Sequence, residues 1–398
     1  MSYSRVSVFG AGAMGSGIAH AFAAASIDVI LIDVTSDLVA HGIKRIEGRC
    51  ATDAKRGKLS PEAMGALMGL IKGSTAVEDA HSSDLVIEAV IEDRKIKGDL
   101  FRSLDRLCRP ECVFATNTSS LSVTDLAFLS GRPDRFLGLH FFNPVHAMKL
   151  VEVIPGLDTA DSVLSRSRDA MKAIGKVPIV AQDCPGFLVN RVLLMYITEA
   201  LLAAEEGVSP EEIDAQAKEA GFPMGPLALV DMVGIDVSYH TQPILHEAYG
   251  VRFPFPQIVR RLFDAGRLGL KTGRGIYGEG KIDDEFRRIV GTVSTSPFSI
   301  ERCIVRAVNE AIYCLQEGVA SAEEIDRAMV LGTGFPEGGP LHWADAKGLD
   351  RVLSILENLA EQKGPRFWPH HLLKTYVAGG RLGKKTKKGF FEYPHAGD

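Results

Sequence analysis

The segment GAGAMG, residues 10–15, constrains the fold of this chain more than any other stretch. It has the spacing G-x-G-x-x-G and follows an apolar run, RVSVF (5–9). A helical pattern, SGIAHAFAAA (16–25), and a second apolar run, IDVILID (27–33), come directly after it. Strand, glycine turn, helix and strand within about thirty residues predict a β-α-β unit of the kind that binds dinucleotides.

Each glycine of this turn has its own expected role. Gly10 permits the tight turn, Gly12 lets a pyrophosphate approach the backbone, and Gly15 lets the helix pack closely on the strand. An ordinary glycine-rich turn is the alternative, but Asp33 ends the second strand where a ribose-diol acceptor belongs. A carboxylate there repels a 2′-phosphate, and no arginine follows it closely. The sequence therefore predicts NAD, rather than NADP, as the cofactor.

Further apolar runs continue the sheet. DLVIEAV (84–90) and CVFAT (112–116) read as strands, separated by the helical pattern RKIKGDLFRSLDRL (94–107). This alternation predicts a Rossmann-like, doubly wound parallel sheet. The segment NTSS (117–120) follows a strand at the edge where ligands bind. It is equally compatible with a helix N-cap, since a helical pattern opens at Leu121.

One histidine and one glutamate stand inside apolar runs. His140 lies near the end of the predicted strand RFLGLHFF (135–142), and Glu152 lies within KLVEVIP (149–155). A buried glutamate without a partner is costly, so we expect Glu152 to pair with His140. Such a pair fixes the imidazole tautomer and stabilises the imidazolium, as a general base for an alcohol proton requires. A histidine that merely packs in the core is the alternative.

Composition limits the class of protein. A net charge of −5 without a basic block argues against nucleic acid as a partner, and the apolar runs are too short for a membrane span. The first residues lack the pattern of a secretory signal, so we expect a cytoplasmic protein. The six cysteines form no C-x-x-C pair, so we expect reduced thiols and no metal site.

The second half of the chain repeats itself with a period of 111 to 114 residues. Three segment pairs carry the repeat: EEGVSPEEID (205–214) with QEGVASAEEID (316–326), GFPMGP (221–226) with GFPEGGP (334–340), and AGRLGLKTGRGIY (265–277) with GGRLGKKTKKGFF (379–391). The pattern throughout is helical, which predicts two homologous all-α domains after the α/β domain. Asn190 of the first copy aligns with Glu301 of the second.

The predicted domain boundaries follow from these patterns. A Rossmann-like domain covers residues 1–183, and the linker QDCPG (182–186) leads into the first helical domain, 184–290. The second helical domain covers residues 291–398 and begins in a stretch of small polar residues. We expect the two helical domains to pack on each other in a protein that is a monomer or a dimer.

Several long segments resemble the L-3-hydroxyacyl-CoA dehydrogenase family over essentially the whole chain: GAGAMGSGIA, ATNTSSL, HFFNPV, MKLVEVI, DCPGFLVNR, GFPMGPLALVDMVGID and LGLKTGRG. The resemblance implies reversible, NAD-dependent oxidation of (S)-3-hydroxyacyl-CoA to 3-oxoacyl-CoA, as in fatty-acid β-oxidation. It implies that His140 is the catalytic base, that Glu152 is its partner, and that Ser119 and Asn190 bind the substrate oxygen. Apart from Ser119, the implied cofactor contacts are Gly10, Gly12, Ala13, Met14, Gly15, Asp33, Glu92, Lys97, Asn143 and Lys271.

Some features leave alternatives open. The basic run DAKRGKLSPE (53–62) carries Lys55 and Arg56, which either bind the phosphates of CoA, as the resemblance implies, or form a solvated helix end. His146 stands where the family usually has proline, so its imidazole either alters substrate preference or faces solvent. A dehydrogenase of the same fold that acts on a non-CoA hydroxy acid or an aromatic alcohol is the alternative function.

Overall fold

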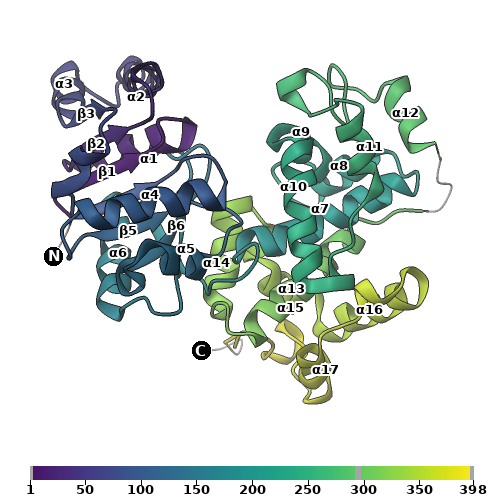
Figure 1. Cartoon of the computed structure of the whole chain (residues 1–398). Coiled ribbons are helices and arrows are strands. Elements are labelled where there is room, and N and C mark those ends of the chain that lie inside the picture. The colour runs from purple at the N-terminus through teal and green to yellow at the C-terminus, as the bar shows by residue number, and fades with distance from the viewer. Residues whose placement is uncertain (1–2, 292–296, 395–398) are drawn as a thin grey trace. The chain divides into compact units, whose positions relative to one another are not determined.

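The computed structural model describes residues 3–291 and 297–394. It divides the chain into two compact units, Met1–Phe187 and Leu188–Asp398, shown in Figure 1. The predicted start of the second helical domain adjoins residues 292–296, which lie outside the described residues. No helix in the described ranges is long and apolar enough to cross a membrane.

The first unit is built on one eight-stranded sheet with the order β3-β2-β1-β4-β5-β6-β7-β8. Neighbouring strands are parallel, except that β6 and β7 are antiparallel. This topology confirms the predicted doubly wound α/β fold and places the reversal of strand order beside β1, where such sheets bind ligands. The strands are β1 (Arg5–Phe9), β2 (Asp28–Ile32), β3 (Ile71–Ser74), β4 (Leu85–Glu88), β5 (Val113–Thr116), β6 (Phe136–Phe141), β7 (Leu150–Pro155) and β8 (Val177–Val180).

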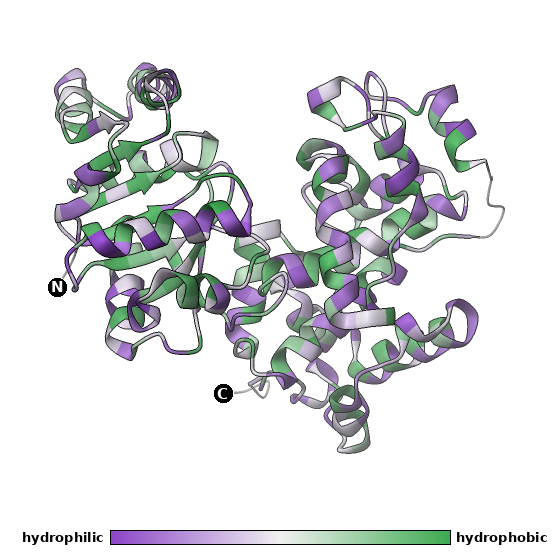
Figure 2. Ribbon diagram, viewed as in Figure 1, coloured by the Kyte–Doolittle hydropathy of each residue, from purple (hydrophilic) through white to green (hydrophobic). Residues whose placement is uncertain are grey.

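Helices cover both faces of the sheet, because each face carries its own apolar cluster. One cluster includes Phe22 of α1 and Ile46 of α2, and the other includes Phe101 of α4 and Leu126 of α5. Figure 2 shows apolar residues concentrated in the strands, whereas helix α4 alternates apolar and polar residues. The helices are α1 (Ala13–Ala24), α2 (Ser36–Lys55), α3 (Pro61–Gly69), α4 (Arg94–Leu107), α5 (Val123–Ser130) and α6 (Asp161–Ala173), with short 3-10 turns η1 (Val77–Ser82) and η2 (Pro133–Arg135).

The second unit is helical, and its elements recur in the order that the sequence repeat predicts. The first set is α7 (Val189–Glu205), α8 (Pro210–Glu219), α9 (Pro226–Val233), α10 (Ile235–Tyr249) and α11 (Gln257–Asp264), with the turns η3 (Gly250–Arg252) and η4 (Leu270–Thr272). After α12 (Asp284–Val290), the second set is α13 (Glu301–Gln316), α14 (Ala322–Thr333), α15 (Pro340–Lys347), α16 (Leu349–Lys363) and α17 (His371–Ala378), with η5 (Pro336–Gly338), η6 (Pro365–Phe367) and η7 (Lys384–Thr386). The elements confirm the predicted helical repeat.

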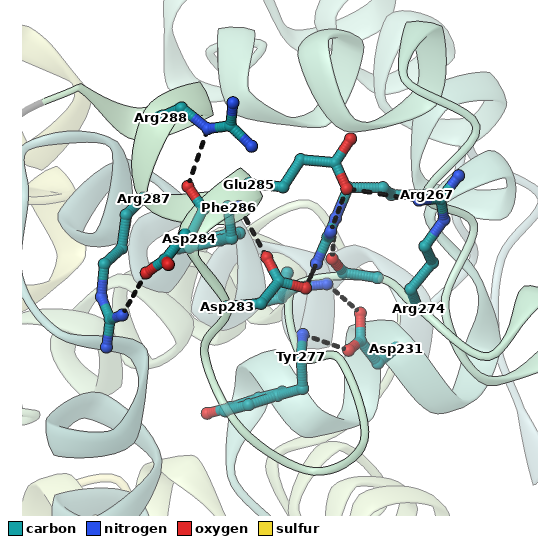
Figure 3. Close-up of polar contacts among 12 residues, drawn as sticks. Asp231, Arg267, Arg274, Tyr277, Asp283, Asp284, Glu285, Phe286, Arg287 and Arg288 are labelled. Atoms are coloured by element: carbon teal, nitrogen blue, oxygen red, sulfur yellow. Dashed lines mark hydrogen bonds and ion pairs between the residues drawn. The ribbon is translucent and has the colours of Figure 1, made fainter.

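A buried carboxylate fixes the same loop in each copy. Asp231 of α9 accepts a hydrogen bond from the amide of Ile276 at 2.7 Å and one from the amide of Tyr277 at 2.8 Å, the second of which Figure 3 shows. The fully buried Arg267 holds the start of this loop through an ion pair with Asp283 at 2.8 Å. Asp345 accepts from the corresponding amides of the second copy, both at 3.0 Å. The loop that carries Lys271 is therefore anchored to α9 by buried polar contacts.

A second buried carboxylate is satisfied by different donors in the two copies. Tyr277 donates its hydroxyl to Asp214 at 2.7 Å in the first copy. The second copy has Phe391 at the tyrosine position, and there His342 places its Nδ1 atom 2.6 Å from Asp326. The loss of one donor is thus matched by the gain of another, so each carboxylate keeps its side-chain hydrogen bond.

Reciprocal ion pairs join the two copies through α7 and α13. Arg191 of the first copy contacts Glu310 of the second at 2.6 Å, and Arg302 of the second contacts Glu199 of the first at 2.7 Å. The two arginines occupy equivalent repeat positions, as do the two glutamates, each 111 residues apart. Such an exchange of identical contacts is typical of a twofold-symmetric interface.

Equivalent residues outside these helices complete the same arrangement. Arg252 lies 3.8 Å from Glu310, and Arg366, which follows it by 114 residues, lies 2.9 Å from Glu199. The buried Arg306 donates to the backbone carbonyls of both Arg252 and Arg366, so it lies between the two halves. Burial lowers the pKa of Arg306 to about 10, which leaves it charged at neutral pH. The contacts between the copies therefore include several paired, buried charges.

Candidate active site

The glycine turn between β1 and α1 has the geometry that a bound pyrophosphate requires. Gly10 has a φ of +96°, and a Cβ atom at Gly15 would overlap the carbonyl oxygen of Gly10. A Cβ at Gly12, in contrast, would meet nothing within 4 Å. Helix α1 begins at Ala13 without a side-chain cap and without an acidic residue in its first turn, which includes Met14. Its amides and its positive dipole end can therefore receive the phosphates of NAD.

Asp33 lies directly after β2, beside the same turn. Its carboxylate accepts hydrogen bonds from the amide of Ala11 at 2.6 Å and from the amide of Val34 at 2.7 Å. The side chain is partly exposed, so a ribose can approach it. At this position the carboxylate can accept hydrogen bonds from the two ribose hydroxyls of the adenosine half of NAD.

We expect Asp33→Ala to weaken NAD binding and to reduce the preference for NAD over NADP, because it removes both the diol acceptor and the negative charge. Cofactor dissociation constants measured by fluorescence titration provide the test. Asp33→Asn is the matched control, since it keeps a hydrogen-bond acceptor but loses the charge, and it is expected to improve NADP binding without the full loss of NAD affinity. An unchanged NAD to NADP ratio in both variants would assign the ribose to another residue.

A buried ionic network lies at the ends of β4 and β5. Lys97 of α4 contacts Glu88 at 2.5 Å and Glu92 at 3.1 Å, and it is almost fully buried. Burial raises the pKa of Glu88 above its usual value despite Lys97. Burial also disfavours the charged form of Glu92, but Lys97 and the hydroxyl of Thr118 outweigh this effect, so the pKa of Glu92 is lowered. Glu92 and Lys97, both predicted cofactor contacts, thus lie together near the nucleotide-binding edge.

The NTSS segment is held by Glu92 and does not cap a helix. Helix α5 begins at Val123 with Ser122 as its N-cap, so the capping interpretation of residues 117–120 is wrong. The amide of Ser119 donates to Glu92 at 2.9 Å. Asn117 accepts from the amide of Phe141 at 2.9 Å, which ties this segment to the strand that carries His140. Ser119 therefore lies at the carboxyl edge of the sheet.

His140 and Glu152 form the pair that the sequence predicts. They are opposite each other on the antiparallel strands β6 and β7, and Nδ1 of His140 lies 2.7 Å from Oε2 of Glu152. His140 is 6% exposed and Glu152 is fully buried. Phe142 and Phe187 place their rings 4.6 and 5.7 Å from the imidazole. A carboxylate can only accept this hydrogen bond, so the Nδ1 atom carries the ring proton and donates it to the bond, and Nε2 of His140 is the basic atom.

A cationic pocket that the sequence did not reveal lies between α1, α2 and the loop after β6. It has a volume of about 240 Å³, and Asn143, a predicted cofactor contact, contributes to its lining. Two arginines and two histidines also line it: Arg45, Arg49, His20 and His146. Burial, followed by the charge of Arg49, lowers the pKa of both histidines, so they are largely neutral at pH 7. The structure places the exposed His146 at this pocket.

The remaining predicted residues lie elsewhere. Lys55 and Arg56 are exposed at the end of α2. Asn190 is in the first turn of α7, and Lys271 is in the 3-10 turn η4, where it pairs with Asp236. Both belong to the second unit. The described ranges contain no cluster of histidine, cysteine and carboxylate side chains that could hold a metal ion.

Comparison with known proteins agrees with this geometry. The family model described as the NAD binding domain of 3-hydroxyacyl-CoA dehydrogenase matches residues 5–184, and the model of the C-terminal domain matches residues 186–279 and 298–393. The fatty acid oxidation complex subunit alpha of Shewanella baltica is 36% identical over 387 residues, which cover 92% of this chain and 54% of that protein. The chain thus spans about half the length of this curated relative.

Two solved structures are similar over almost their whole length. The 3-hydroxybutyryl-CoA dehydrogenase of Escherichia coli has a TM-score of 0.86 and 32% identity, covering 95% of this chain and 99% of that chain. The (S)-3-hydroxybutyryl-CoA dehydrogenase of Ralstonia eutropha has a TM-score of 0.68 and 38% identity, covering 70% of this chain and 99% of that chain. This chain therefore belongs to the 3-hydroxyacyl-CoA dehydrogenase family, which confirms the predicted family, the oxidoreductase class and NAD as the cofactor.

Proposed function

We propose that this chain catalyses the reversible oxidation of an (S)-3-hydroxyacyl-CoA to the 3-oxoacyl-CoA with NAD. The observation that carries the proposal is the buried His140–Glu152 pair, at 2.7 Å, in the same unit as the glycine turn and Asp33. A base for an alcohol proton and a dinucleotide site are the two parts that an alcohol dehydrogenase requires. The names of the similar proteins support a CoA thioester as the substrate.

In this mechanism the protein orients the substrate and moves one proton. His140 accepts the C3 hydroxyl proton at Nε2, while Glu152 holds the ring in the correct tautomer and stabilises the imidazolium that forms. NAD held at the glycine turn and Asp33 would supply the acceptor for the hydride that leaves C3. We assign Ser119 and Asn190 as the groups that hydrogen-bond the substrate oxygen. The aromatic rings of Phe142 and Phe187 pack beside the imidazole and limit its access to water.

We assign CoA recognition to one side of α2. Arg45 and Arg49 lie four residues apart on this helix, and Lys55 and Arg56 stand at its C-terminal end. Arg49 is already paired with Asp53 at 2.9 Å, so a phosphate there shares the arginine with a carboxylate. Arg45 and Arg49 line the pocket described above, whereas Lys55 and Arg56 are exposed. The pocket is therefore expected to contribute more to CoA binding than the exposed helix end.

The two cation pairs are distinguishable by paired substitutions. We expect replacement of Arg45 and Arg49 by Ala to raise the KM for a CoA thioester by roughly tenfold with a small change in turnover, because these contacts are equal in ground and transition states. The matched control, replacement of Lys55 and Arg56 by Ala, is expected to change KM by less than about threefold, and only at low salt. The reverse order would assign CoA to the helix end.

The substrate class is tested by comparing thioesters with free acids. Purified enzyme and NAD are mixed with (S)-3-hydroxybutyryl-CoA, with longer (S)-3-hydroxyacyl-CoA thioesters, or with free 3-hydroxybutyrate, and NADH formation is followed by absorbance. We expect turnover with the thioesters and kcat/KM lower by at least about a hundredfold with the free acid. Equal rates with the free acid would favour the alternative, a dehydrogenase of non-CoA hydroxy acids.

We propose that the enzyme works in a reducing compartment such as the cytoplasm, because its six cysteines are free thiols. We also propose that the second helical copy occupies the place that a partner subunit would take against the first. The exchanged contacts Arg191–Glu310 and Arg302–Glu199 support this proposal. The full chain is then a monomer, or a dimer formed through some other surface.

A further inference from the structure

Two of the six cysteines, Cys108 and Cys112, flank a tight turn in the first unit. Cys108 directly follows α4 as its C-cap, and its amide donates to the carbonyl of Leu104 at 2.8 Å. Cys112 leads into β5, and its amide donates to the carbonyl of Arg109 at 3.0 Å. The three residues between the cysteines are exposed, whereas the cysteines themselves are 6% and 1% exposed. Both side chains belong to the same apolar cluster, beside α4 and β5.

Arg132 holds both ends of this turn together. Its Nη1 atom donates to the carbonyls of Arg109 at 2.9 Å and Cys112 at 3.3 Å. Its Nε atom donates to Asp105 of α4 at 2.8 Å, and the side chain is 8% exposed. The guanidinium therefore fixes the turn against α4 and places a positive charge near the two thiols. A nearby arginine favours the thiolate form of cysteine.

Each of the two thiols shifts the pKa of the other, although in the structure the Cys108 thiol donates to the carbonyl of Ala80 at 3.5 Å and the Cys112 thiol donates to the carbonyl of Val113 at 3.7 Å. The Cys112 thiol is the main cause that lowers the pKa of Cys108, and Arg132 adds to the effect. The Cys108 thiol, together with burial, raises the pKa of Cys112. Cys108 is therefore the thiol that ionises first, and it is also the more exposed of the two. A thiolate with a second thiol beside it is the arrangement of an oxidisable pair.

We propose that Cys108 and Cys112 form a reversible dithiol–disulfide pair that exchanges with small-molecule disulfides such as oxidised glutathione. The Cys108 thiolate attacks one sulfur of glutathione disulfide and releases one glutathione thiolate, which takes up the proton that Cys108 lost. The Cys112 thiolate then attacks the Cys108 sulfur in the mixed disulfide and releases the second glutathione, which is protonated in turn. Two protein thiols are thus oxidised to one disulfide, and one glutathione disulfide is reduced to two thiols.

This pair lies away from the nucleotide site. Cys112 precedes the first residue of β5, whereas the glycine turn and Asp33 follow the last residues of the parallel strands β1 and β2. The disulfide closes the connection between α4 and β5 and limits the freedom of the unfolded chain. We therefore expect oxidation to raise the thermal midpoint of the full chain by a few degrees and to change NAD affinity by less than about twofold. Failure of this inference leaves the proposed function intact.

The oxidation state of the two cysteines can be measured on a single tryptic peptide. Arg109 precedes proline and resists trypsin, as does Arg132, so residues 107–135 form one peptide that contains Cys108 and Cys112 and no other cysteine. The folded full chain is treated with oxidised glutathione, quenched, denatured in N-ethylmaleimide and digested. We expect this peptide to be lighter by two hydrogen atoms, without maleimide, and dithiothreitol to restore two alkylatable thiols.

Matched variants show that the bond joins these two residues. In Cys108→Ser and Cys112→Ser the remaining thiol of the peptide is expected to carry maleimide or glutathione, and the thermal midpoint is expected to be insensitive to oxidised glutathione. Cys50→Ser, at another buried cysteine, should keep the full response. The inference is overturned if, in the oxidised unsubstituted chain, residues 107–135 carry two maleimides or two glutathiones.

Discussion

Substitution of His140 by glutamine is expected to reduce turnover by roughly two to four orders of magnitude, the range for the loss of a general base. Glutamine preserves a polar side chain of similar reach, so it can still hydrogen-bond Glu152, but it has no basic nitrogen to accept the hydroxyl proton. NAD affinity should stay within about twofold, because the glycine turn and Asp33 are untouched. Steady-state kinetics with a CoA thioester and fluorescence titration with NAD measure the two effects.

Two further substitutions make this test specific. His146→Gln changes the exposed histidine of the cationic pocket and is expected to leave turnover within a few-fold of the unsubstituted enzyme. Glu152→Gln keeps the size of the side chain but removes the charge that stabilises the imidazolium, so turnover should fall without a loss of NAD binding. A His140→Gln enzyme with turnover within a few-fold of normal would remove His140 from the role of base.

Removal of the second helical copy, by ending the chain after residue 291, is expected to cause self-association or aggregation of the fragment. Helix α7 would lose the helix α13 that packs on it. Arg191 would lose its partner Glu310, and Glu199 would lose its partner Arg302. Breaking a buried ion pair by removing one partner costs about 3–5 kcal/mol, and an uncovered apolar face adds a tendency to associate. Light scattering on the full chain and on the fragment measures the effect.

Light scattering distinguishes three outcomes for the fragment. A dimer of fragments would mean that two first copies replace the pair of unlike copies, with α7 against α7, as the repeat symmetry allows. Aggregation would mean that the exposed face finds no ordered partner. A fragment that stays monomeric, and as stable to heat as the full chain, would contradict the account. The first copy would then be stable without the contacts that the second copy makes to it.

The parts of the molecule that depend on local sequence were predictable. The glycine turn, Asp33 and the strands around His140 and Glu152 each have a spacing that only a few local structures satisfy. The helical repeat was visible because its two copies keep the same loop motifs. Strands β3 and β8 were missed because IKGS and VPIV are too short to show alternation.

Contacts between distant segments could not be read from the sequence. Arg49, His20 and His146 come from three separate elements and meet only in the folded unit. The helix α13 shows the same limit: we expected the two helical domains to pack on each other, but nothing local indicated that Arg302 and Glu310 would be buried between them. Charged residues are normally exposed unless they are paired, and the α7 partners Glu199 and Arg191 lie more than a hundred residues away.

Transfer of deuterium tests the central claim most directly. The enzyme is given NAD and (S)-3-hydroxybutyryl-CoA that carries deuterium at C3, and the reduced cofactor is analysed by mass spectrometry and NMR. The account predicts one deuterium on the nicotinamide ring for each 3-oxobutyryl-CoA formed, and loss of this transfer in His140→Gln. Oxidation of the thioester without deuterium in the reduced nicotinamide, or no oxidation of the thioester at all, would contradict it.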